Sequence, residues 1–143
     1  AMLTATRRFV EETLRLYPPA WTVGRRTLCS LPLGPYTVPE DTLLLCPQFV
    51  IHRDPRWFAE PEVFNPERWR DAQPARGAFF PFGGGTRICI GEGFARMEAT
   101  LVLATLCRDW TFHQVSAAPT ELTTGITLRP RAGLPLRAVR STL

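Results

Sequence analysis

Two stretches of the chain repeat apolar residues at the three- to four-residue spacing of an amphipathic helix. The first covers residues 3–16 and stops at the prolines of "YPPA". The second covers residues 92–108, and its apolar positions are Phe94, Met97, Leu101, Val102 and Leu106. The pattern predicts two long helices and places Leu101, Val102 and Leu106 in the core.

Shorter apolar runs predict strands. Before the second helix, the candidate strands are residues 21–29, 36–38 and 42–46, separated by the turn sequences "LPLGP" and "PED". One short helix is predicted for residues 47–53, since proline suits a first helical turn. After the second helix, residues 110–115 and 120–139 are typical of short antiparallel strands, with a hairpin tip at Thr124 and Gly125.

The segment "RDPRWFAEPEVFNPERWRDAQPARG", residues 53–77, has too many prolines for long regular elements. It is expected to be an ordered coil at the surface. Four aromatic residues are expected to anchor it: Trp57, Phe58, Phe64 and Trp69. The whole pattern predicts an α+β fold with two long helices, short mixed or antiparallel strands and a long coil.

Charge adds one observation to this picture. The sequence has 17 basic and 13 acidic residues, a net charge of +4, and every basic residue is arginine. Arginine suits fixed, bidentate contacts with carboxylates. The arginines are scattered rather than gathered in a run, so no nucleic-acid partner is predicted.

The four cysteines lie at wide, irregular spacing with no CxxC pair: Cys29, Cys46, Cys89 and Cys107. This spacing argues against a zinc site and a disulfide framework, and favours a reducing compartment. Cys29, Cys46 and Cys107 are interpreted as small core residues. No apolar run reaches membrane-spanning length. The N-terminus lacks the features of a signal peptide and reads like a chain entered midway.

The candidate functional residues lie mainly in "FPFGGGTRICIGEGFAR", residues 80–96, where a glycine-rich loop precedes a predicted helix. Such a loop often binds phosphate. A Walker loop needs a lysine, which this chain lacks, and neither G-x-G-x-x-G nor the G-x-S-x-G elbow occurs. What remains is Cys89, close to a helix N-terminus, where the helix dipole and free N–H groups favour the thiolate.

A thiolate at this place is either a nucleophile or a metal ligand. The only histidines, His52 and His113, lie far from Cys89 in the sequence, so a base for a nucleophile is not evident. The residues around the cysteine support the metal ligand. Phe82, Gly85, Arg87, Cys89 and Gly91 form F-x-x-G-x-R-x-C-x-G.

This motif resembles the haem-binding loop of the cytochrome P450 family. Two further signatures of that family stand in the expected order: Glu12 and Arg15 form E-x-x-R, and residues 66–69 read "PERW". The resemblance covers essentially the entire chain. It implies the C-terminal, proximal haem-side part of a single P450 domain over residues 1–143, with the N-terminal part missing.

The resemblance implies a role for each matched residue. Cys89 would be the thiolate ligand of the iron in haem b, shielded by Phe82. Arg87 would bind a haem propionate, and so would Arg25, with Arg26 as the alternative. The remaining residues expected at the haem are Gly85, Gly91 and Ala95.

Other residues of the resemblance lie away from the ligand. Glu12 and Arg15 share a helix face, and with Arg68 they would tie the coil to the core beneath the haem. The residues expected to face the substrate are Ala20, Trp21, Thr22, Val23, Gly125 and Ile126. His52 is interpreted as structural, with contact to the haem periphery as the alternative.

The function implied is that of a haem-thiolate monooxygenase. Such an enzyme binds a small apolar organic substrate and O2. It takes electrons from NAD(P)H through a redox partner, either a ferredoxin or flavodoxin type or a fused reductase. Taken by itself, this chain is expected to be inactive.

Two alternatives stay open. Some haem-thiolate relatives are isomerases or dehydratases, often with an altered cysteine loop, whereas the spacing from Phe82 to Cys89 is undisturbed here. The other alternative is a truncated, non-catalytic haem-binding module. A cytoplasmic protein of the soluble bacterial type is expected, with a membrane anchor upstream as the alternative.

Overall fold

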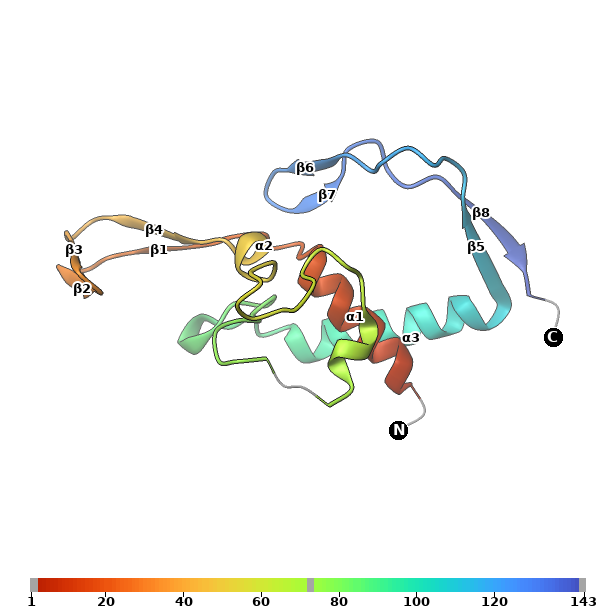
Figure 1. The fold of residues 1–143 in the computed structure, drawn as a ribbon, viewed down its shortest axis with the longest axis horizontal. Helices are drawn as coiled ribbons and strands as arrows, with labels where there is room; N and C mark the ends of the chain where they lie inside the picture. Colours follow the sequence, from red (N-terminus) through yellow and green to blue (C-terminus); the bar gives the residue numbers. More distant parts are fainter. Residues whose placement is uncertain (1–2, 72–73, 142–143) are drawn as a thin grey trace.

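The computed structural model describes residues 3–71 and 74–141. Two long helices cross near the middle of the molecule (Figure 1): α1, Thr4–Leu16, and α3, Glu92–Asp109. Both agree with the predicted helices to within one residue at each end. Helix α1 ends where Tyr17 meets the following prolines, because proline cannot continue the backbone hydrogen bonds of a helix.

Helix α1 is followed by a double ribbon that projects to the left in Figure 1. Strand β1, Val23–Arg26, pairs antiparallel with β4, Leu43–Cys46, and at the far end β2, Leu31–Leu33, pairs with β3, Tyr36–Val38. The predicted turn at "LPLGP" is therefore wrong over Leu31–Leu33. A two-stranded ribbon has open edges, where a proline such as Pro32 is tolerated, and the reversal itself falls at Gly34, whose φ is +59°.

The C-terminal part forms two further antiparallel ribbons, as predicted. Strand β5, Trp110–Gln114, pairs with β8, Leu136–Arg140, and β6, Leu122–Thr124, pairs with β7, Leu128–Pro130. The β6–β7 hairpin turns back over the segment that follows α1 (Figure 1), where the Leu128 N–H donates to the Pro19 carbonyl at 2.9 Å.

Between the ribbons, the chain forms α2, Gln48–Ile51, capped by Pro47, and then the coil. A 3-10 turn, η1, Pro66–Trp69, interrupts the coil, and the Asn65 side chain caps it by accepting from the Glu67 N–H at 3.0 Å. The other short turn, η2, covers Gly85–Arg87.

The aromatic residues of the coil differ in burial. Phe58 is buried, Trp69 is half-buried, and Phe64 packs edge-on against Phe9 with 4.9 Å between ring centroids. Trp57 is 50% exposed, so its prediction as an anchor is wrong. Trp57 borders a hollow with Phe58 and Trp69, but these neighbours leave half of its side chain exposed.

The core is small. The buried apolar side chains among the described residues are Val10, Leu16, Pro18, Phe58, Ala78 and Pro81. The prediction that Leu101, Val102 and Leu106 lie in the core is wrong, because they are 51%, 52% and 43% exposed. The cysteines Cys29, Cys46 and Cys107 are also exposed, contrary to prediction. These residues lie on ribbons or on faces of α3 that no described element covers.

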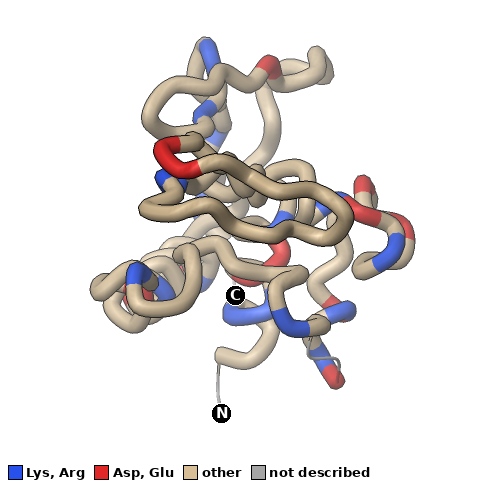
Figure 2. Tube along the Cα trace, turned by 90° about the vertical axis from the view of Figure 1, so that its left-hand side faces the viewer, with Lys and Arg blue, Asp and Glu red and all other residues tan. Residues whose placement is uncertain are grey.

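Within residues 3–71 and 74–141, no helix has both the length and the apolar character needed to cross a bilayer. Arginines occur in several separate parts of the trace rather than in one patch (Figure 2).

Candidate functional site

Residues 80–91 form a loop that is closed by its own backbone and carries the candidate cysteine. The Gly83 N–H donates to the Phe80 carbonyl at 2.9 Å, and the Cys89 N–H donates to the Phe82 carbonyl at 2.9 Å. Gly83 and Gly85 have φ of +78° and +67°, which side chains with a Cβ rarely adopt. The glycines of the motif therefore let the chain reverse and bring Cys89 back beside Phe82.

Helix α3 begins directly after this loop. Gly91 is its N-terminal cap residue, and the Glu92 N–H donates to the Cys89 carbonyl at 3.2 Å. Cys89 is exposed. A Cβ at Gly91 would lie 3.8 Å from the Cys89 sulfur, so this glycine borders the thiol directly.

Cys89 lines a cavity of about 400 Å³ between α1, β1, the cysteine loop and α3. The cavity is bordered by Val10, Leu14, Pro19, Ala20, Val23, Arg25, Pro81, Phe82, Gly83, Arg87, Cys89, Ala95 and Ala99. The lining is apolar except for Cys89 and the two arginines. Segments more than 50 residues apart in the sequence thus meet at the cavity that contains the Cys89 sulfur.

The structure distinguishes Arg25 from Arg26. Arg25 borders the cavity, and its guanidinium donates to the neighbouring Gly24 carbonyl at 2.8 Å. Arg26 forms an ion pair with Asp41 at 2.8 Å instead. Arg87 also borders the cavity, and neither Arg25 nor Arg87 has a carboxylate partner among the residues the structure describes.

The remaining predicted residues do not line the cavity. Gly85 and Gly91 belong to the loop backbone, and Trp21 and Thr22 follow the cavity residue Ala20. Gly125 and Ile126 form the tip of the β6–β7 hairpin, where Ile126 is fully exposed. The Trp21 indole N–H donates to the Gly125 carbonyl at 3.0 Å, so the two predicted substrate-facing segments are joined to each other.

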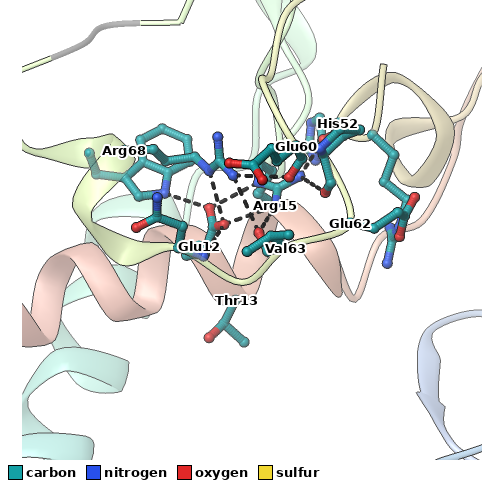
Figure 3. Close-up of polar contacts among 12 residues, drawn as sticks. Glu12, Thr13, Arg15, His52, Glu60, Glu62, Val63 and Arg68 are labelled. Atoms are coloured by element: carbon teal, nitrogen blue, oxygen red, sulfur yellow. Dashed lines mark hydrogen bonds and ion pairs between the residues drawn. The ribbon is translucent and has the colours of Figure 1, made fainter. Parts of the chain in front are cut away.

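Glu12 is the centre of a buried polar network between α1 and the coil (Figure 3). Its Oε1 accepts from Arg15 at 2.8 Å, from Arg68 at 3.0 Å and from the Asn65 N–H at 2.8 Å. Its Oε2 accepts from Arg15 at 2.9 Å and from the Trp69 indole N–H at 2.8 Å. Figure 3 shows both side chains of the E-x-x-R pair pointing to the coil, away from Thr13.

Arg15 and Arg68 extend this network to the coil backbone. Arg15 donates to the carbonyls of His52 at 2.9 Å, Pro61 at 2.7 Å and Val63 at 3.2 Å. Arg68 donates to three coil carbonyls, those of Ala59, Glu60 and Val63. The coil has little regular hydrogen bonding, and these guanidinium groups replace it.

Burial and hydrogen bonding act in opposite directions on Glu12. Burial would raise the pKa of its carboxyl group, but the bonds from Arg15, the Asn65 N–H, Trp69 and Arg68 outweigh burial and hold the pKa below its usual value. Glu12 is therefore a carboxylate at neutral pH, with its charge compensated inside the fold.

Sequence reasoning did not identify several residues of the site. Asn65 and Trp69 complete the shell around Glu12, and nothing in the sequence pattern marks them as its donors. Arg96 forms ion pairs with Glu11 of α1 and with Glu92, and its guanidinium lies 5.0 Å from the ring centroid of Phe82. Arg96 thus connects α1, α3 and the cysteine loop.

A family model described as cytochrome P450 matches residues 1–135. Among curated proteins, cyclooctatin synthase of Streptomyces melanosporofaciens is 39% identical over 139 residues, covering 95% of this chain and 28% of the relative. Pentalenene oxygenase of Streptomyces avermitilis is 40% identical over 111 residues, covering 76% of this chain and 25% of the relative. The chain thus spans little more than a quarter of the length of these relatives.

Solved structures give the same result for the fold. The haem domain of a cytochrome P450DA mutant superposes with a TM-score of 0.88 at 24% identity, covering 96% of this chain and 31% of that structure. Cyanobacterial CYP120A1 with bound retinoic acid superposes with a TM-score of 0.86 at 28% identity, covering 94% of this chain and 32% of that structure.

Proposed function

Since the chain belongs to the cytochrome P450 family, we propose that it forms the part of a haem-thiolate monooxygenase that holds haem b on its thiolate side. The observation that carries the proposal is the cavity in which Cys89 lies between apolar walls and two arginines, Arg25 and Arg87, that form no ion pair with any described carboxylate. Haem-thiolate ligation is general in this family, and the residues of this cavity fit such a cofactor.

The chemical groups of haem match the residues that line the cavity. Haem is flat and largely apolar, with two propionates at one edge, and the cavity combines apolar walls with Arg25 and Arg87. A thiolate is a soft ligand that suits iron. Among the described residues no cluster of three or more His, Cys, Asp or Glu could hold a metal ion.

In this proposal, each residue at the cavity has its own task. The Cys89 sulfur is the protein ligand, and Gly91 keeps the space beside it free of a side chain. Phe82, whose carbonyl accepts from the Cys89 N–H and which borders the same cavity, would shield the sulfur from water when haem is bound. Arg25 and Arg87 bind and orient the propionates.

The small side chain of Ala95 would allow α3 to approach the haem closely, and Gly85 allows the cysteine loop to turn. The substrate-facing residues remain Ala20, Trp21, Thr22, Val23, Gly125 and Ile126. Trp21 directly follows the cavity residue Ala20 and is bonded to the Gly125 carbonyl, and the small or apolar residues of these two segments would suit an apolar organic substrate.

When bound, haem b supplies the reductive chemistry by which two electrons from NAD(P)H and one O2 place one oxygen atom in the substrate and the other in water. A redox partner would deliver the electrons. Two relatives have names that describe the same reaction class, cyclooctat-9-en-7-ol 5-monooxygenase and pentalenene oxygenase. The expected cytoplasmic location stays a prediction.

The experiment uses the haem-loaded protein that carries this chain, a surrogate ferredoxin system and ¹⁸O2. Incorporation of one labelled atom into an apolar substrate, dependent on NAD(P)H, supports the proposal. Product that forms without label or reductant would instead indicate an isomerase or dehydratase. Haem binding with no product from any of a panel of apolar substrates would favour a non-catalytic module.

A further inference from the structure

The side chains of Gln48 and His52 hold the first residue of the cysteine loop. These residues lie four apart across α2, so they share a face, and both are fully buried. The Gln48 amide Nε2 donates to the Phe80 carbonyl at 3.2 Å, and the Phe80 N–H donates to His52 Nε2 at 3.0 Å. Both backbone polar groups of Phe80 are therefore bound by side chains from a distant element.

The protonation state of His52 follows from these contacts. Because Nε2 accepts a hydrogen bond, the proton of the neutral ring is on Nδ1. Burial lowers the pKa of His52 to about 4, against the opposing effect of the Arg15 and Leu14 backbone carbonyls. The ring packs against Phe79 and Phe80, with 5.0 and 5.3 Å between centroids. It does not line the cavity at Cys89.

Two backbone hydrogen bonds connect Phe80 to Cys89. The Phe80 carbonyl, fixed by Gln48, also accepts from the Gly83 N–H and so defines the turn that contains Phe82. The Phe82 carbonyl then accepts from the Cys89 N–H at 2.9 Å. Movement at Phe80 would therefore shift the residue that holds Cys89.

His52 also faces the buried network of Glu12. Its backbone carbonyl accepts from Arg15 at 2.9 Å, while its ring accepts from Phe80. His52 thus joins the E-x-x-R network to the cysteine loop, the first through its backbone carbonyl and the second through its ring.

We propose that Gln48 and His52 are positioning residues that set the place of the Cys89 sulfur through Phe80, in addition to stabilising the fold. The proposal rests on the proposed function in one respect, namely that Cys89 is the iron ligand. The contacts that position the loop can be tested without haem.

The experiment compares three variants with a matched control. His52→Phe keeps a ring but removes the acceptor, His52→Gln restores a side-chain oxygen acceptor, and Gln48→Met keeps length but removes the donor. The control is His113→Phe, at the exposed histidine of β5. The first readout is amide hydrogen exchange at Phe80 and Cys89. The second is the fraction of the reduced carbon monoxide complex that has the red-shifted Soret band. Both are measured at a temperature well below that of unfolding.

We expect exchange at Phe80 and Cys89 to be roughly tenfold faster in His52→Phe and Gln48→Met, the factor that corresponds to about one hydrogen bond. Hydrogen exchange of amides in the middle of α3 should be unchanged, and His52→Gln should restore most of the protection at Phe80 and Cys89. The fraction of the complex with the red-shifted Soret band should fall in His52→Phe and Gln48→Met and recover in His52→Gln. If Phe80 exchanges faster while Cys89 and the Soret band stay as in the wild type, the positioning role is refuted.

Should His52→Phe fail to fold, Gln48→Met decides by the same criteria. A wild-type protein without the red-shifted band would refute the proposed function. The exchange data would still decide whether α2 positions the loop.

Discussion

The guanidinium of Arg68 donates to the Glu12 carboxylate at 3.0 Å, across 56 residues of chain. This bond joins the coil to α1 at a carboxylate that is fully buried and accepts from four residues. The cysteine loop and the coil thus depend on the same helix, one through His52 and the other through Glu12.

Removing the Glu12 charge should strongly destabilise the fold. Glu12→Gln leaves the Arg15 and Arg68 guanidiniums in the interior without their carboxylate, which costs roughly 3–5 kcal/mol. Chemical denaturation measures the free energy of unfolding. The control is Glu121→Gln, which removes an exposed partner of Arg131 and should change stability by less than about 1 kcal/mol. Equal effects of the two variants would contradict a structural network at Glu12.

The arginines at the cavity should affect haem retention rather than folding. In the proposed function, Arg25→Ala and Arg87→Ala would each remove a charge-assisted bond to a propionate, and haem loss should be roughly tenfold faster or more. Transfer of haem to a scavenging protein measures this rate, with thermal unfolding as the check on the fold. Arg26→Ala is the neighbouring control, because Arg26 pairs with Asp41 away from the cavity. If Arg26→Ala lost haem as fast as Arg25→Ala, the assignment of Arg25 would be wrong.

His52 should make stability depend on pH. The unfolded chain binds a proton at this histidine near pH 6.5, and the folded protein only near pH 4, so acid favours unfolding between these values. Stability should fall by about 1.4 kcal/mol per pH unit as pH drops through this interval. Glu12, whose pKa is lowered in the fold, adds a further loss below its ordinary value of 4.5. Denaturation at several pH values should show the slope between pH 6 and 5 in the wild type and its absence in His52→Gln. A flat wild-type profile would contradict a buried neutral ring.

Taken by itself, the 143-residue chain should associate and bind haem weakly. Helix α3 exposes Phe94, Met97 and Leu101 by 64%, 53% and 51%, and exposed apolar faces of this kind promote self-association. Sedimentation of the purified chain, with and without added haem, tests this. A monomer that takes up haem and shows the full thiolate spectrum would refute it.

Local sequence pattern was enough to predict the two long helices, the β6–β7 hairpin and the loop at Cys89, because each depends on short-range spacing or on glycine and proline. Burial could not be predicted in this way. Leu101 and Val102 repeat at helical spacing, but periodicity shows only which face is apolar, not whether an element covers it. Contacts at Glu12 from Trp69, and at Phe80 from Gln48, depend on the path of an irregular coil, which has no periodic signal.

The most direct test of the account is the carbon monoxide difference spectrum of the reduced, haem-loaded protein that carries this chain, compared with its Cys89→His variant. If Cys89 is the iron ligand, the wild type shows the red-shifted Soret band of a thiolate-ligated haem and the variant loses it completely. Cys107→Ser, at an exposed cysteine outside the cavity, should keep the band. A red-shifted band that survived in Cys89→His would show that another residue is the ligand.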